Sequence, residues 1–242
     1  MMATLKQLKK TFQARADKTR ALSTSAYFKT GKGEYGEGDI FLGISVPERQ
    51  KIVRGFLDLG YADLDTLLKS RFHEYRSSAL QILETKFEKA DKVEQKKIVT
   101  FYLAHADRIN NWDLVDMSVR EILGAWYYKV EKEKVLKFFL KLARSKNIWE
   151  RRMAIVATHA FIVKGDMVPT FAVTEALMKD KHDLVHKACG WMLREVGKKD
   201  QKKLKTFLEK HAAVMPRTML RYSIEHFTPA ERQYYMRKKS VV

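Results

Sequence analysis

Residues 183–196 read DLVHKACGWMLREV, and this stretch decides the fold class. Its apolar side chains Val185, Cys189, Met192 and Val196 recur every three or four residues, which is the spacing of one face of an α-helix. The same spacing recurs along almost the whole chain, and alternating strand patterns are nearly absent. With 45% hydrophobic residues and only 4 prolines, the 242-residue chain is expected to fold throughout. The sequence therefore predicts an all-α protein.

New helical pairs are predicted to open at a regular interval along the chain. The predicted openings lie near His73, Trp112, Ile148, Asp183 and Pro216. They are spaced by about 33 to 39 residues, which is the range of helical solenoid repeats. The alternative is an irregular bundle of amphipathic helices.

Other helix starts carry capping signals. Ser45 is expected to be an N-cap, with Pro47 at an early helical position and Glu48 completing a capping box. Pro216 and Pro229 likewise stand where helices are expected to begin.

The charge balance points to a polyanionic partner. Lysine and arginine total 47 against 29 acidic residues, for a formal charge of +18. Nucleic acid is favoured over an anionic membrane, because no stretch approaches 18 apolar residues and the lysines are spread along the chain. A solubilising surface charge is the alternative. Stacked pairs are expected to present cations along one curved face, among them Arg76, Arg152, Lys187 and Arg217.

One segment departs from helical patterning. Residues 30–39 read TGKGEYGEGD and hold four of the 11 glycines, so we expect a loop or a glycine-rich β-hairpin. The glycine spacing fits neither a phosphate-binding P-loop nor a dinucleotide-binding turn. A hairpin carrying Lys32 and Tyr35 would be able to enter a DNA groove; the alternative is a flexible connector.

The sequence predicts neither a cofactor nor a metal site. The seven histidines form no HExxH motif or His/Cys cluster, and the lone Cys189 is expected to be a buried small side chain. A single cysteine excludes an internal disulfide, and the lysine-rich start, Met1 to Arg20, has no apolar signal-peptide core. We therefore expect a bacterial-type cytoplasmic protein, associated with the nucleoid and not with a membrane.

Trp112 and Asp116 form the clearest candidate site. They lie at positions i and i+4, which places an aromatic face and a carboxylate on one side of one helix. The alternative is that Asp116 only pairs with Arg120, one turn further on. Trp149, next to Ile148, is expected to be a core residue.

Four blocks carry a resemblance to a known family. They are FLGISVPER (41–49), WDLVD (112–116), IWERRMAI (148–155) and KACGWMLRE (187–195). In this order they resemble the AlkD family of DNA alkylation repair glycosylases, over about residues 27–221. The resemblance implies a right-handed solenoid of HEAT-like helical pairs with a concave basic cleft for double-stranded DNA. It also implies a single repeat domain over 1–242, with N-terminal helices in 1–29, the insertion at 30–39 and repeats over 45–240.

The resemblance also implies an activity and a set of site residues. The activity is hydrolysis of the N-glycosidic bond of N3- or N7-alkylated purines, by a monomer that needs no cofactor or metal and no tight base pocket. Asp116, Trp112 and Trp191 match the catalytic residues of the family. The residues expected to contact DNA are Arg152, which matches a backbone-binding arginine, Tyr27 near the lesion, and Arg151, Lys187, Lys32 and Tyr35.

Two departures from the family pattern support a second reading. The insertion at 30–39 lies where catalytic members have a shorter connection, and Ser45 and Val46 replace a more polar pair. A hairpin here resembles the AlkF and AlkG branch, which implies binding of branched or distorted DNA without base excision. A helical scaffold for another protein is a third reading, but it explains neither the charge nor the motifs.

Overall fold

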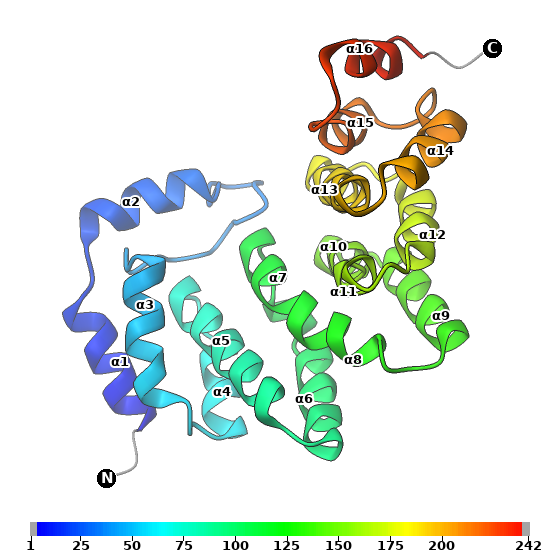
Figure 1. The fold of residues 1–242 in the computed structure, drawn as a ribbon. Coiled ribbons are helices and arrows are strands. Elements are labelled where there is room, and N and C mark those ends of the chain that lie inside the picture. Colours follow the sequence, from blue (N-terminus) through cyan, green and yellow to red (C-terminus); the bar gives the residue numbers. More distant parts are fainter. Residues whose placement is uncertain (1–3, 239–242) are drawn as a thin grey trace. The chain divides into compact units, whose positions relative to one another are not determined.

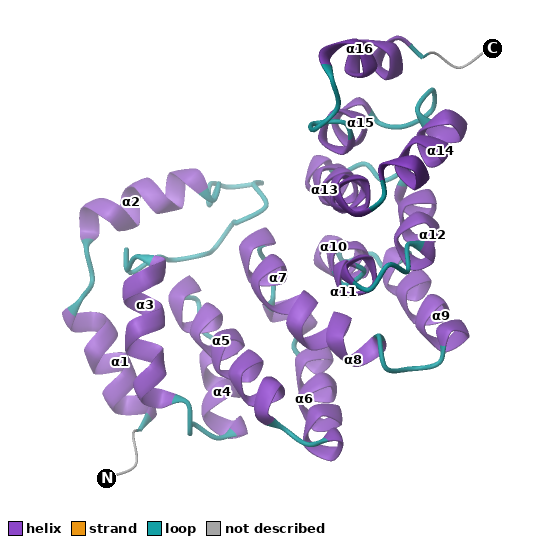
Figure 2. Cartoon of the chain, in the orientation of Figure 1, coloured by secondary structure: helices purple, strands orange, loops and turns teal. Residues whose placement is uncertain are grey.

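The computed structural model describes residues 4–238, which form helices joined by loops (Figures 1 and 2). Within this range no β-strand occurs, and an isolated bridge pairs Ile40 with Phe72. The all-α prediction is therefore confirmed. The chain divides into two compact units, with the boundary between Ser118 and Val119. The single repeat domain expected over 1–242 stays a prediction.

In the first unit, one row of helices is backed by a second. The α-helices are α1 (Leu5–Ala14), α2 (Lys18–Tyr27), α3 (Val46–Val53), α4 (Tyr61–Leu68), α5 (His73–Lys89), α6 (Lys92–Ala104) and α7 (Trp112–Val119). The short 3-10 segments η1 (Arg54–Phe56) and η2 (Ala106–Arg108) follow α3 and α6. Helices α1, α3 and α5 pack in series, and α4 and α6 both pack on α5. The core between them includes the fully buried Leu64, Leu83 and Ile98.

The second unit continues from α7 through a π-helical segment, η3 (Arg120–Gly124). Its α-helices are α8 (Ala125–Tyr127), α9 (Lys132–Ala143), α10 (Ile148–Val156), α11 (His159–Val163), α12 (Val168–Leu177), α13 (Asp183–Lys199), α14 (Gln201–His211), α15 (Arg217–Ser223) and α16 (Pro229–Arg237). Helices α10, α13 and α15 pack in series, while α12 and α14 pack on α13. Each unit therefore contains stacked helices in two rows. The solenoid and cleft expected of the whole chain stay predictions.

Most of the predicted helix starts are confirmed. Helices begin at His73, Trp112, Ile148 and Asp183, and α15 begins directly after its N-cap, Pro216. These positions could be read from the sequence because the signals that start a helix are local.

The capping box expected at Ser45 is wrong, although Ser45 is the N-cap of α3. Its side chain makes no capping hydrogen bond, and Glu48 instead pairs with Arg15 at 3.3 Å. Helix α16 does begin at Pro229, behind a capping box formed by Thr228 and Glu231. Glu48 therefore forms a long-range ion pair with Arg15 and not the capping hydrogen bond that the local pattern predicts.

Gly190 allows α13 and α15 to approach closely. A Cβ atom added at Gly190 would lie 2.4 Å from the Cβ of Tyr222 and 2.6 Å from the carbonyl oxygen of Met219. Alanine gains roughly 1 kcal/mol in helix propensity, but the backbone of α15 would have to move. We expect Gly190→Ala to lower the free energy of unfolding by about 1–3 kcal/mol, measured by urea denaturation.

The control for this substitution is Gly55→Ala. A Cβ atom added at Gly55 meets nothing within 4 Å, so its effect should stay within about 0.5 kcal/mol. Equal stability of the two variants would contradict the close packing of α13 on α15.

Candidate nucleic-acid interface

Trp112 and Asp116 lie one turn apart at the start of α7, and both are half-buried. The start of the helix is fixed by Asn111, whose Oδ1 accepts the backbone N–H of Trp112 at 2.8 Å. Leu114 and Val115 are fully buried and anchor the helix to the core of the first unit. An indole and a carboxylate therefore share the accessible side of one rigid turn.

Aromatic side chains surround Trp112 in the first unit. Phe28 stacks on the indole, with ring centroids 5.2 Å apart and an interplanar angle of 20°. Tyr27 meets the indole edge-on at 6.1 Å, and its side chain remains 66% exposed. The Trp112 Nε1–H donates to the hydroxyl of Tyr35 at 3.3 Å. The structure thus brings both predicted tyrosines to Trp112.

The glycine-rich segment forms a series of turns, and not a β-hairpin. The N–H of Gly36 donates to the carbonyl of Lys29 at 3.0 Å, and the N–H of Asp39 donates to the carbonyl of Gly36 at 3.1 Å. A Cβ atom at Gly36 would lie 2.4 Å from the carbonyl oxygen of Phe28, so glycine is required there. Of the two residues expected to enter DNA, Lys32 is exposed and Tyr35 contacts Trp112.

A buried ionic cluster anchors the end of this segment. The Asp39 carboxylate accepts from Arg76 at 2.7 Å and lies 3.2 Å from Nδ1 of His73. The other ring nitrogen of His73 lies 2.8 Å from the carboxylate of Asp113, on α7. Arg76 is only 2% exposed. The prediction that Arg76 lines a cationic surface is therefore wrong, because it neutralises a buried carboxylate.

The cluster shifts the pKa values of its members. Burial alone would raise the pKa of Asp39, but hydrogen bonding to His73 and the charge of Arg76 hold it below its ordinary value of 3.8. Burial alone would lower the pKa of His73, but the charge and hydrogen bond of Asp113 and the hydrogen bond of Asp39 raise it above 6.5. The two carboxylates thus favour the protonated imidazole of His73.

The raised pKa of His73 predicts a pH-dependent stability. Its contribution is fully present below the ordinary pKa of 6.5 and is lost as the pH rises through the raised folded-state pKa. We expect the difference in unfolding free energy between the wild type and His73→Gln to be largest in acid and to shrink as the pH rises above 6.5. Urea denaturation at a series of pH values measures it. A difference that does not change with pH would show that folding leaves the pKa of His73 unshifted.

Glu74 holds the FLGI stretch next to this cluster. Its carboxylate, 3% exposed, accepts the backbone N–H groups of Leu42 at 3.0 Å and of Gly43 at 2.9 Å. Gly43 has a φ of +79°, and a Cβ atom there would lie 2.1 Å from the carbonyl oxygen of Asp17. This role of Glu74 was not predicted from the sequence. The signal for it is a run of polar residues, His73, Glu74 and Arg76, at the start of a buried helix.

In the second unit, Trp191 lies on α13 and its ring contacts the guanidinium of Arg120. The guanidinium of Arg120 is 5.8 Å from the centre of the Trp191 ring, within the range of a cation–π contact. Arg120 belongs to the π-helical segment η3, and such segments often occur at functional sites. From the sequence, Arg120 was predicted only as a possible ion-pair partner of Asp116.

The basic residues expected at the DNA differ in exposure. Arg152 is 5% exposed and donates to the carbonyl oxygen of Leu184 at 2.5 Å. Arg151 pairs with the carboxylate of Asp180 at 2.6 Å. Lys187 is half-buried and pairs with Asp183 at 2.8 Å, one turn earlier on α13. Within the second unit, Arg151 and Arg152 therefore also link α10 to the start of α13, whereas the Lys187 pair lies within α13.

Two core predictions are confirmed in the second unit. Trp149 is 6% exposed, and Cys189 is fully buried. Burial raises the pKa of the Cys189 thiol, so the thiolate is disfavoured.

A search of residues 4–238 finds no group of three or more His, Cys, Asp or Glu side chains arranged to hold a metal ion. None of the helices in the same range combines the length and apolar character that a bilayer span needs.

Comparisons with known proteins give a consistent result. Residues 8–227 match the family described as DNA alkylation repair enzyme. A structure described as a predicted DNA alkylation repair enzyme from Enterococcus faecalis is similar, with a TM-score of 0.69 and 18% identity, over 89% of this chain and 98% of that one. The smu.31 protein of Streptococcus mutans UA159 is also similar, with a TM-score of 0.53 and 18% identity, over 90% and 94% of the two chains. No curated protein matches the chain.

Proposed function

The chain belongs to the DNA alkylation repair enzyme family, and from this premise we propose that it is a DNA glycosylase for N3- and N7-alkylated purines. The observation that carries the proposal is that Trp112 and Asp116 lie one turn apart on α7, in a member of this family. The formal charge of +18 supports double-stranded DNA as the partner.

The substrate explains why few catalytic groups are needed. An N-alkylated purine is cationic and leaves C1′ of the deoxyribose with the electrons of the glycosidic bond, as a neutral base. Water then adds to C1′ and loses a proton. The barrier depends mainly on stabilising the positive charge that develops on the sugar.

The site residues supply that stabilisation in the proposed mechanism. The carboxylate of Asp116 faces the developing charge and orients the attacking water. The indole of Trp112 packs against the sugar and offers its electron-rich face. Since Phe28 covers one face of Trp112, the sugar meets the other. The resemblance to the family assigns a like role to Trp191, the adjacent phosphate to Arg152 and the lesion to Tyr27.

The proposed mechanism uses no lysine nucleophile. Asp116 and water suffice, so the products are a free base and an intact abasic strand. We expect borohydride treatment during turnover to trap no covalent adduct with DNA, as measured by denaturing electrophoresis. A trapped adduct would contradict a monofunctional glycosylase.

The second candidate function is selective binding of branched or distorted DNA without catalysis. The contact of Tyr35 with Trp112 favours it, because the insertion reaches the indole that the glycosylase reaction needs. On this reading, replacing residues 31–38 by a shorter linker weakens binding to a four-way junction more than to linear duplex. On the glycosylase reading, the two affinities change together, and base release from methylated duplex continues.

A further inference from the structure

Two segments of the chain, one in each unit, are similar in sequence. Residues 94–105 read EQKKIVTFYLAH, and 106 positions later residues 200–211 read DQKKLKTFLEKH. The two segments form most of α6 in the first unit and of α14 in the second. They share Gln, Lys, Lys, Thr, Phe and His at the same offsets.

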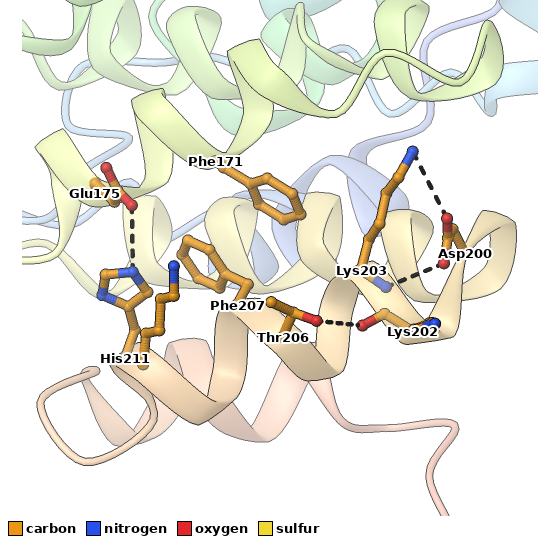
Figure 3. Close-up of a pocket in the computed structure, with 9 residues that line it drawn as sticks. Phe171, Glu175, Asp200, Lys202, Lys203, Thr206, Phe207 and His211 are labelled. Atoms are coloured by element: carbon orange, nitrogen blue, oxygen red, sulfur yellow. Dashed lines mark hydrogen bonds and ion pairs between the residues drawn. The ribbon is translucent and has the colours of Figure 1, made fainter.

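Each segment borders a groove against a neighbouring helix. In the first unit the groove lies between α4 and α6 and has a volume of about 500 Å³. In the second it lies between α12 and α14 and has a volume of about 480 Å³ (Figure 3). The residues that line both grooves from equivalent helix positions are Lys96 and Lys202, Lys97 and Lys203, Thr100 and Thr206, Phe101 and Phe207, and Ala104 and Lys210.

The two grooves are built from the same contacts. In the second unit, Phe207 stacks on Phe171 at 4.8 Å, and His211 pairs with Glu175 at 3.2 Å (Figure 3). The matching contacts in the first unit are Phe101 with Tyr61 at 5.0 Å and His105 with Asp65 at 2.9 Å. An acidic residue also pairs with the second lysine of each segment, Glu94 with Lys97 at 3.2 Å and Asp200 with Lys203 at 3.6 Å.

Four of the six identities lie at positions that line both grooves, whereas the shared Gln95 and Gln201 line neither groove. Four of the five groove-lining positions carry the same residue in both segments, whereas positions 99, 102 and 103 differ from 205, 208 and 209 and do not line the grooves. The lysines and threonines are exposed, so core packing does not require them. A shared ligand explains why these surface residues are the same.

We propose that each groove is a docking site for an acidic protein segment that inserts an apolar anchor side chain. Lys96 and Lys202 are exposed at the rims, and among residues 4–238 neither forms an ion pair. Acidic side chains flanking the anchor would pair with these lysines. Lys210 adds a cation where the first groove has Ala104, and the second groove is also lined by Asp200 and Glu175, which pair with Lys203 and His211.

The ring geometry favours a protein segment over a nucleic acid. A base needs an open aromatic face on which to stack. In the second groove Phe207 stacks on Phe171 at 10° and is only 6% exposed, so it offers no open face to a base. A leucine or phenylalanine side chain needs only an apolar cavity. The grooves also lie on helices that carry none of the residues proposed to contact DNA.

The test uses the capped peptide acetyl-Glu-Glu-Leu-Phe-Glu-Glu-Leu-amide and the full chain. The imidazole NMR signals of His105 and His211 report the two grooves separately, and calorimetry gives the stoichiometry. We expect both signals to shift, two peptides to bind per chain, and binding to weaken with salt. The same peptide with lysine in place of glutamate should bind at least tenfold more weakly.

Charge reversal locates the binding. Lys202→Glu with Lys203→Glu should abolish the response of His211 and leave that of His105, and Lys96→Glu with Lys97→Glu should do the reverse. Reversal of the exposed Lys137 and Lys141, outside both grooves, should leave both responses. The proposal is overturned if neither signal shifts at millimolar peptide. It is also overturned if an oligothymidylate shifts the same signals and displaces the peptide. None of these experiments measures base release. A failure of this proposal therefore leaves the proposed glycosylase function untouched, and the reverse also holds.

Discussion

Asp116→Asn is expected to slow the release of 7-methylguanine from methylated duplex DNA by about 10²–10³-fold. The amide keeps the shape of the side chain but loses the charge that stabilises the oxocarbenium-like sugar. The affinity for DNA should not fall, because the substitution removes a negative charge next to a polyanion. Single-turnover assays with saturating protein separate the chemical step from binding.

The matched control for this prediction is Asp107→Asn. Asp107 is exposed on η2 in the same unit and is not part of the proposed site. Its release rate should equal that of the wild type. Unchanged release by Asp116→Asn, or equal loss in both variants, would remove Asp116 from the mechanism.

Asp39→Ala is expected to lower the free energy of unfolding by about 3–5 kcal/mol. It leaves Arg76 buried and without its carboxylate partner, and it removes one of the two carboxylates beside His73. The glycine-rich segment should also lose its anchor, so its backbone amides should exchange faster. Urea denaturation and hydrogen exchange measure the two effects.

Two further variants test the cause of this loss. Arg76→Met in the Asp39→Ala background should restore part of the stability, because no unpaired buried guanidinium then remains. Asp58→Ala, at an exposed carboxylate, should change the stability by less than about 0.5 kcal/mol. If Asp39→Ala is as mild as Asp58→Ala, the buried cluster does not anchor the segment.

The helices could be predicted from the sequence because their signals are local. The starts at His73, Trp112, Ile148 and Asp183 follow from apolar spacing within a few positions. The burial of Trp149 followed from the same periodicity. No distant contact was needed for these predictions.

The surroundings of Trp112 could not be predicted, because they depend on distant contacts. Tyr35 reaches Trp112 across 77 positions, and Asp39 reaches Arg76 across 37. No spacing rule connects such residues, so the glycine-rich segment remained either a hairpin or a loop. Arg76 looked like a surface cation for the same reason, since its buried partner lies on another element.

The two similar groove segments could be seen in the sequence, but their contacts could not be predicted from it. The likeness of residues 94–105 to 200–211 is visible in the sequence. Their separation of 106 positions is about three times the predicted interval between helix pairs, so the two copies lie in pairs that are not adjacent. The contacts that these residues make with α4 and α12 join distant positions, and no spacing rule predicts them.

The most direct test of the central claim is whether the wild-type protein releases free 7-methylguanine and 3-methyladenine from methylated duplex DNA, with binding to a four-way junction measured in parallel. The account predicts release of both bases at a rate well above spontaneous depurination, leaving an intact abasic strand. Tight binding to the junction with no base released from the duplex would contradict it, and would assign the chain to structure-selective DNA binding instead.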